Sequence, residues 1–162
     1  MSASRAVLDV LRENARYDVE DIARQTDLDA EAVEAAIEEL EASGAIRGYK
    51  PVVDWNNVDE EYVRAEVELN VELDRETSYD DIARRIARYS QVDSLKLVSG
   101  NYDFAVDVQG PSMQEVSKFV SEQIAPIPEV TQTVTHFVME TYKDSGIEFE
   151  DYDDDDRLSV SP

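Results

Sequence analysis

Few side chains in this sequence could perform catalysis or hold a metal ion. There is no cysteine, which excludes disulfides, thiolate zinc sites and a cysteine nucleophile. The single histidine, His136, has no carboxylate at metal-ligand spacing beside it. The acidic stretch at 151–156 lacks the central glycine and the closing glutamate of a calcium loop. With no nucleophile–base pair and no phosphate-binding loop, the sequence predicts no catalytic residue, no metal site and no cofactor.

A second group of side chains could bind the phosphates of a nucleic acid. The first 54 residues contain only 6 basic side chains against 13 acidic ones, so the candidates are few. Arginine, lysine and threonine can donate to phosphate oxygens, and a carboxylate can accept from the N4 amine of cytosine. The candidates for contact with DNA are Arg16, Arg24, Thr26, Glu31, Arg47 and Lys50.

A third candidate is the segment formed by Ser99, Gly100, Asn101, Tyr102 and Asp103. Gly-Asn is typical of a tight turn between two strands, and forming that turn is its first role. Backbone N–H groups at such a turn can also hold a carboxylate, and Asp103 could then meet an amino group. The segment is therefore a candidate for binding a small ligand.

The cationic candidates lie around three predicted helices. Apolar residues at helical spacing indicate an amphipathic helix over about the first fifteen residues. Asp18 is a suitable N-cap for a second, short helix, and Asp29 for a third helix that ends at Gly44. Residues 45–54 then indicate a small hairpin around Gly48. Three short helices followed by a hairpin predict a winged helix-turn-helix over residues 1–54.

The candidate ligand segment belongs to a second predicted unit. Every odd residue from 63 to 73 is apolar, which predicts a strand with one solvated face. Helices are predicted from Ser78 and Ser112, and further strands at 92–99, 102–109 and 130–139. This βαββαβ order is that of a ferredoxin-like α+β domain over residues 62–142. Residues 55–61 are predicted as a hinge and residues 143–162 as an acidic tail.

The net charge of the chain is unusually negative. There are 38 acidic against 15 basic residues, giving −23, and the basic ones are 11 Arg and 4 Lys. This balance argues against a generic polyanion binder. It predicts a protein that stays soluble in concentrated salt, where the Debye length is only ~3 Å and charge repulsion is screened. No stretch approaches the ~18 apolar residues of a membrane span, so we expect a soluble, cytoplasmic protein without a membrane partner.

Three segments, in this order and spacing, resemble the Lrp/AsnC (feast/famine) transcription regulators over residues 5–142. They are Ser43-Gly44-Ala45-Ile46-Arg47-Gly48-Tyr49 after the third helix, Leu97-Val98-Ser99-Gly100-Asn101-Tyr102-Asp103 at the hairpin, and Phe137-Val138-Met139-Glu140 at the last strand. The extreme acidity further suggests a haloarchaeal member of this family.

The resemblance implies a DNA-binding transcription regulator that is not an enzyme. In this family the C-terminal domain dimerises and senses a small molecule, commonly an amino acid, and the dimers often assemble into tetramers or octamers. The ligand pocket lies between protomers near the hairpin loop, here residues 99–103, and residues of the last strand, here Thr133 and Thr135, lie near it. Bound ligand would change the dimer–dimer geometry and hence the spacing of the helix-turn-helix pairs.

The third helix departs from the family pattern. Its exposed residues include Glu31, Glu34 and Glu38, where family members usually place serine, threonine, proline and several basic residues. Two functions therefore stay open: a ligand-responsive regulator, or a metabolite-sensing partner subunit of a hetero-oligomeric regulator that does not bind DNA by itself. Siroheme decarboxylases have a similar architecture, but their arginine-rich stretch after the third helix is absent here.

Overall fold

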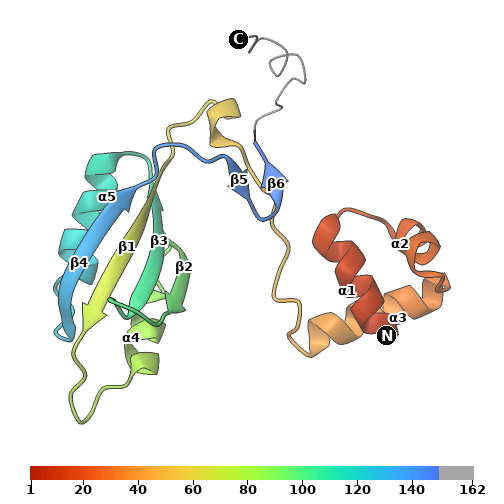
Figure 1. Cartoon of the computed structure of the whole chain (residues 1–162), viewed down its shortest axis with the longest axis horizontal. Coiled ribbons are helices and arrows are strands. Elements are labelled where there is room, and N and C mark those ends of the chain that lie inside the picture. Colours follow the sequence, from red (N-terminus) through yellow and green to blue (C-terminus); the bar gives the residue numbers. More distant parts are fainter. Residues whose placement is uncertain (150–162) are drawn as a thin grey trace, which may run out of the picture. The chain divides into compact units, whose positions relative to one another are not determined.

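The computed structural model describes residues 1–149, which form two units that divide between Pro51 and Val52 (Figure 1). The first unit contains helices α1 (Ala3–Glu13), α2 (Val19–Thr26) and α3 (Ala30–Ala42). The second contains a four-stranded sheet with two helices. The predicted boundary at residue 54 thus lies slightly too far along the chain.

Each helix of the first unit begins after a side chain that caps it. Ser2, Asp18 and Asp29 accept hydrogen bonds from backbone N–H groups three residues ahead, at 3.3, 2.7 and 2.8 Å. These bonds satisfy donors that the first turn of a helix leaves unpaired. The caps predicted at Asp18 and Asp29 are confirmed.

The apolar stripes of the three helices meet in one core. Its buried members are Val7, Leu11, Ile22, Val33, Ala36 and Leu40. Because α3 contributes the last three at helical spacing, one side of this helix faces the core and the other faces solvent. The solvent side is where a partner molecule would meet it.

The structure does not contain the predicted hairpin of the first unit. Residues 45–54 form no strand, and no atom lies within 4 Å of where a Cβ would stand on Gly48. Two strands this short bury too little apolar surface to hold a ribbon together alone. The helix before them ends as predicted, because Gly44 has a φ of +74° and its N–H donates to the carbonyl of Glu41 at 3.0 Å.

The second unit has the predicted βαββαβ order. Its strands are β1 (Val63–Val71), β2 (Val92–Leu97), β3 (Phe104–Gly110) and β4 (Val130–Phe137), all antiparallel to their neighbours in the order β2-β3-β1-β4. The helices are α4 (Tyr79–Ile86) and α5 (Met113–Phe119), the second continued by a π-helical turn, Val120–Ile124. The predicted α+β fold is confirmed.

Alternation along β1 gives the sheet one covered and one open face. Ala65, Val67 and Leu69 are buried in a core to which α4 and α5 also contribute. Glu66 and Glu68, on the alternate positions, lie on the face that these helices do not cover. The open face therefore carries charge at its centre.

The predicted hinge and the start of the predicted tail fold with the second unit. Trp55–Asn57 form a 3₁₀ turn, and the Trp55 ring stacks on Tyr62 with 3.8 Å between centroids. Short strands β5 (Lys143–Asp144) and β6 (Ile147–Glu148) form a hairpin. The prediction of a tail from 143 is therefore wrong as far as residue 149. The aspartate run at 153–156 lies outside the described residues. Within residues 1–149, no helix is long and apolar enough to cross a membrane.

Helix α4 begins with a capping box formed by Ser78 and Asp81. The Asp81 carboxylate accepts hydrogen bonds from the backbone N–H and the hydroxyl of Ser78, at 2.9 and 2.8 Å, and these bonds lower the pKa of Asp81. A lowered pKa stabilises the folded state above the ordinary aspartate pKa, and this contribution is lost as pH falls through the folded value.

We expect Asp81→Asn to lower the melting temperature of the second unit at neutral pH. The difference in melting temperature between this variant and the unchanged protein should disappear as the pH falls below about 4. Trp55 is the only tryptophan, so its fluorescence follows this unit during melting. Asp80→Asn, in the same helical turn, is the matched control. A gap of constant size at every pH would contradict the role given to the Asp81 carboxylate.

Candidate functional site

The solvent side of α3 carries a row of glutamates. Among the described residues, Glu31, Glu34 and Glu38 are exposed and have no hydrogen-bond or ion-pair partner. Their spacing places them along one side of the helix. Two further glutamates are held within the unit: Glu39 accepts from the Ser4 hydroxyl, and Glu41 accepts from the Tyr49 hydroxyl at 3.0 Å. The free row sits where a helix-turn-helix presents its second helix to DNA.

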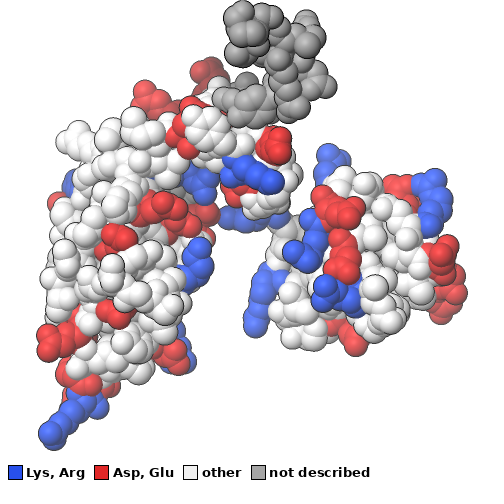
Figure 2. Space-filling model, in the orientation of Figure 1, with Lys and Arg blue, Asp and Glu red and all other residues white. Residues whose placement is uncertain are grey.

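The predicted phosphate-contacting residues are distributed around α2 and after α3. The Arg24 guanidinium is paired with Asp21, and the Thr26 hydroxyl donates to the carbonyl of Ile22 at 2.7 Å. Arg47 folds back on the end of α3, where a Cβ on Gly44 would lie 3.3 Å from its Cζ. Arg16 and Lys50 are exposed. Figure 2 shows basic side chains scattered among acidic ones over the visible face of this unit, without a continuous basic surface.

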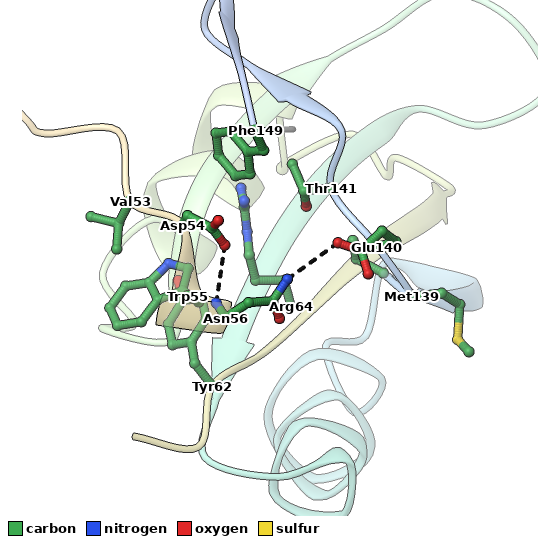
Figure 3. A pocket seen from close by; sticks show the side chains of 11 residues that line it. Val53, Asp54, Trp55, Asn56, Tyr62, Arg64, Met139, Glu140, Thr141 and Phe149 are labelled. Atoms are coloured by element: carbon green, nitrogen blue, oxygen red, sulfur yellow. Dashed lines mark hydrogen bonds between the residues drawn. The ribbon is translucent and has the colours of Figure 1, made fainter. Parts of the chain in front are cut away.

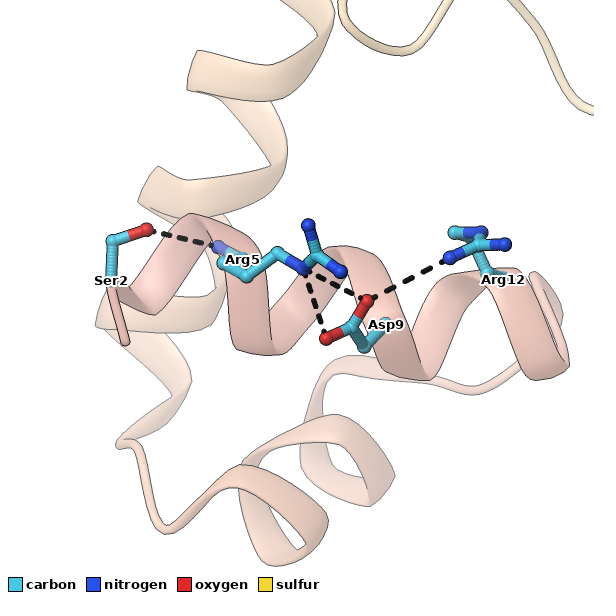
Figure 4. A network of polar contacts seen from close by, with 4 residues as sticks. All are labelled: Ser2, Arg5, Asp9 and Arg12. Carbon is cyan, nitrogen blue, oxygen red and sulfur yellow. Dashed lines mark hydrogen bonds and ion pairs between the residues drawn. The ribbon is translucent and has the colours of Figure 1, made fainter.

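Helix α1 adds two arginines that are not among the predicted DNA contacts. Arg5 and Arg12 lie on either side of Asp9, with Nε–Oδ2 3.1 Å and Nη1–Oδ1 4.0 Å (Figure 4). The i,i+4 and i,i+3 spacings were the available signal. Because these side chains are largely exposed, the pairs add little stability. Their net positive charge is therefore available to an anionic partner.

The predicted ligand loop is longer than a two-residue turn, because β2 ends at Leu97 and β3 begins at Phe104. Gly100, with a φ of +125°, takes a conformation that favours glycine. Asp103 fixes the end of the loop to β1: its N–H donates to the carbonyl of Leu69 at 2.8 Å, and its Oδ2 accepts from the N–H of Val71 at 2.9 Å. This structural bond to the Asp103 side chain was not predicted.

The predicted ligand residues do not form one site within a single chain. Thr133 and Thr135 pair with Leu69 and Val67, so they face the helix-covered side of the sheet at the edge strand β4. Two strand spacings, about 10 Å, separate β4 from β3 and the loop. Tyr102 instead lines a hollow of about 300 Å³ on the open face. A pocket that uses both groups needs a second chain.

Charged side chains line the hollow on the open face together with apolar ones. The Nε2 atom of His136 lies 3.0 Å from Oε2 of Glu68. Glu66 on β1 pairs with Asp107 on β3, so these two carboxylates are cross-strand neighbours. Lys96 lines the same hollow. Within residues 1–149 no group of three or more His, Asp or Glu residues could hold a metal ion.

Two family models match the two units. Residues 3–47 match the winged helix-turn-helix DNA-binding model, and residues 64–147 match the Lrp/AsnC ligand binding domain. The chain belongs to the Lrp/AsnC family. The second match extends into the β5–β6 hairpin. The structure likewise shows that this segment is folded and is not part of a tail.

Known proteins resemble the chain over most of its length. It is 39% identical to YugG, an uncharacterized HTH-type transcriptional regulator of Bacillus subtilis, over 96% of this chain and 95% of that one. It is 23% identical to the leucine-responsive regulatory protein of Escherichia coli, over 88% and 86%. The fold also matches a Neisseria meningitidis transcriptional regulator solved with L-Met, with a TM-score of 0.70, 20% identity and coverage of 89% and 92%.

The chain is thus an Lrp/AsnC-type DNA-binding transcriptional regulator with a ligand-binding domain. The relatives named above are a transcriptional regulator and a leucine-responsive regulatory protein. The helix-turn-helix lies in the first unit, and the ligand-binding domain is the β-sheet unit. One chain therefore carries both a DNA-binding domain and a ligand-binding domain.

Proposed function

We propose that this regulator responds to an amino acid bound between copies of its second unit, and that it acts as a homodimer or larger homo-oligomer in the cytoplasm without enzymatic activity. The strongest support is that one chain combines both domains and aligns over 96% of its length with a transcriptional regulator. One relative is named for its response to leucine, and another was solved with L-Met. Both names favour an amino-acid effector.

The proposed effector site is built across two chains. Backbone N–H groups of Ser99, Gly100, Asn101 and Tyr102 would hold the carboxylate, and the Asp103 oxygen not bonded to Val71 would meet the ammonium group. Thr133 and Thr135 would come from a neighbouring copy, since within one chain they lie on the other face of the sheet. The effector then changes how copies pack, and so the spacing of their helix-turn-helix units.

The proposed DNA interface uses α3 in the major groove and a few flanking contacts. Arg16, Arg24, Arg47, Lys50 and Thr26 would contact phosphates, and Glu31 would accept from a cytosine amine. Such an interface makes about 4–6 phosphate contacts and loses its counterion-release contribution in molar salt. We further propose that this protein works in a salt-rich, haloarchaeal-type cytoplasm, where bound cations bridge its carboxylates and the phosphates.

A second function is favoured by the free glutamate row on α3. Glu31, Glu34 and Glu38 repel phosphates, and Arg24 of α2 is already paired with Asp21. The alternative is a metabolite-sensing subunit that reaches DNA only together with a more basic relative. In that case the second unit supplies the ligand site and the pairing surface.

The two functions are separated by recovering the protein with its chromatin from a native host and sequencing the bound DNA. We expect discrete peaks that are lost when Arg24 and Arg47 are both changed to alanine. Arg84→Ala with Arg85→Ala, two exposed arginines of α4, is the matched control and should keep the peaks. No enrichment over an untagged strain, with a relative co-purifying, would contradict the first function and favour the second.

A further inference from the structure

A pocket in the second unit lies away from the loop at 99–103. It is lined by the start of this unit, the beginning of β1, the chain after β4 and the end of the β5–β6 hairpin (Figure 3). Its cavity volume is about 110 Å³. That is smaller than the ~300–1,000 Å³ of pockets for drug-sized ligands, so the space suits only a small molecule.

Arg64 gives this pocket an anion-binding group. Its guanidinium rises between Asp54 and Glu140 toward Phe149 in Figure 3. Among the described residues the guanidinium has one ion pair, Nη1 to Asp144 Oδ2 at 3.6 Å, and no hydrogen bond. The Arg64 side chain is only 28% exposed. A guanidinium with unused donors in a partly buried site suits a carboxylate, which it can bind through two parallel bonds.

The other polar groups of the pocket are acidic. Asp54 accepts from the backbone N–H of Asn56 at 3.1 Å and from the side-chain amide of Asn57 at 2.8 Å. Glu140 accepts from the Asn56 amide at 3.2 Å through one oxygen, which leaves its second oxygen unused. A plain anion would be repelled by these two carboxylates, whereas a ligand that also carries an ammonium group would be attracted to them.

The remaining walls are apolar. The Trp55 ring, held by its stack on Tyr62, and the Phe149 ring line the pocket together with Val138. Such walls suit a short aliphatic body between the two charged ends.

We propose that this pocket is a second ligand site, which binds a small zwitterionic amino acid with its carboxylate on Arg64, its ammonium group on Glu140 and Asp54, and its side chain against Trp55 and Phe149. The site is distinct from the effector site proposed at residues 99–103. It does not depend on how the chain binds DNA.

The test is a fluorescence titration of the full chain, because Trp55 is its only tryptophan and lines the pocket. L-valine, with its short aliphatic side chain, is the probe. We compare it with 3-methylbutanoate, which lacks the ammonium group, and 2-methylpropylamine, which lacks the carboxylate. We expect a saturable change in Trp55 fluorescence with L-valine. Each analogue should bind at least about tenfold more weakly than L-valine. No saturable change with L-valine, or equal binding of 3-methylbutanoate, would overturn the proposal.

Variants locate the binding. Arg64→Gln and Glu140→Gln should each weaken L-valine binding about tenfold, because each removes one charge. In the Glu140→Gln variant the amide oxygen of the new side chain could still accept from Asn56, so the local structure is kept. Arg84→Gln, on α4, is the control and should leave the titration unchanged. Asp103→Asn, which removes the charge proposed to meet the ammonium group at the loop, should also leave the titration unchanged. A response that survives Arg64→Gln but disappears in Asp103→Asn would place the amino acid at the loop and refute the second site.

Discussion

Changing Glu31, Glu34 and Glu38 together to glutamine is expected to raise the affinity for double-stranded DNA about 500-fold at ~0.1 M salt, and hardly at all at ~1 M salt. These carboxylates are exposed on one side of α3 and have no partner within residues 1–149. With α3 against DNA, each one must take up a cation when the complex forms. Removing three such uptakes steepens the salt dependence of the affinity by about 2.7 logarithmic units for each tenfold change in salt. Anisotropy of a labelled duplex over a salt series measures this.

A control separates local repulsion from overall charge. Changing Asp59 to asparagine and Glu60 and Glu61 to glutamine removes the same number of charges from the second unit. This variant should change the affinity far less and keep the original salt slope. Equal gains from both triple variants would mean that the gain comes from overall charge and that α3 does not face DNA. If the α3 variant loses binding to a particular operator and the control variant keeps it, that result would instead support the base contact assigned to Glu31.

The fold could be predicted because its signals are local. Asp18 and Asp29 cap their helices through bonds to N–H groups three residues away, so the signal needs no tertiary contact. The alternation along β1 has the same character, since residues 65, 67 and 69 are buried and 66 and 68 are not fully buried. The prediction of a hairpin at residues 45–54 was wrong for the opposite reason. The stability of such a short ribbon depends on packing partners that the sequence alone does not show.

The sites were less predictable because they depend on distant segments. Arg64 and Asp144 are far apart in sequence and lie 3.6 Å apart in space, at a segment for which the sequence predicted a tail. The predicted ligand residues Thr133 and Thr135 were correctly placed in the last strand, yet strand register turns them to the face opposite the hollow that Tyr102 lines. A two-residue periodicity shows which residues of one strand share a face. It does not show the order of the strands in the sheet or their register, which decide whether two distant residues lie close together.

Asp103→Ala is expected to destabilise the second unit by about 2 kcal/mol, even though the residue was selected as a ligand contact. Strand β1 continues past its last pairing with β3, which joins Leu69 to Phe104. The N–H of Val71 therefore lacks a backbone partner on β3, and the Asp103 carboxylate accepts it at 2.9 Å. Alanine leaves this partly buried donor without a protein acceptor. Urea unfolding followed by Trp55 fluorescence measures the loss.

Asp103→Asn separates the structural bond from the proposed effector contact. The asparagine side-chain oxygen can still accept from Val71, so the unfolding free energy should stay within about 1 kcal/mol of the unchanged protein. The charge that would meet the ammonium group of an effector is removed, so the effect of the amino acid on DNA binding should weaken about tenfold. If the asparagine variant keeps a full effector response while the alanine variant loses it, Asp103 shapes the loop and does not contact the ligand.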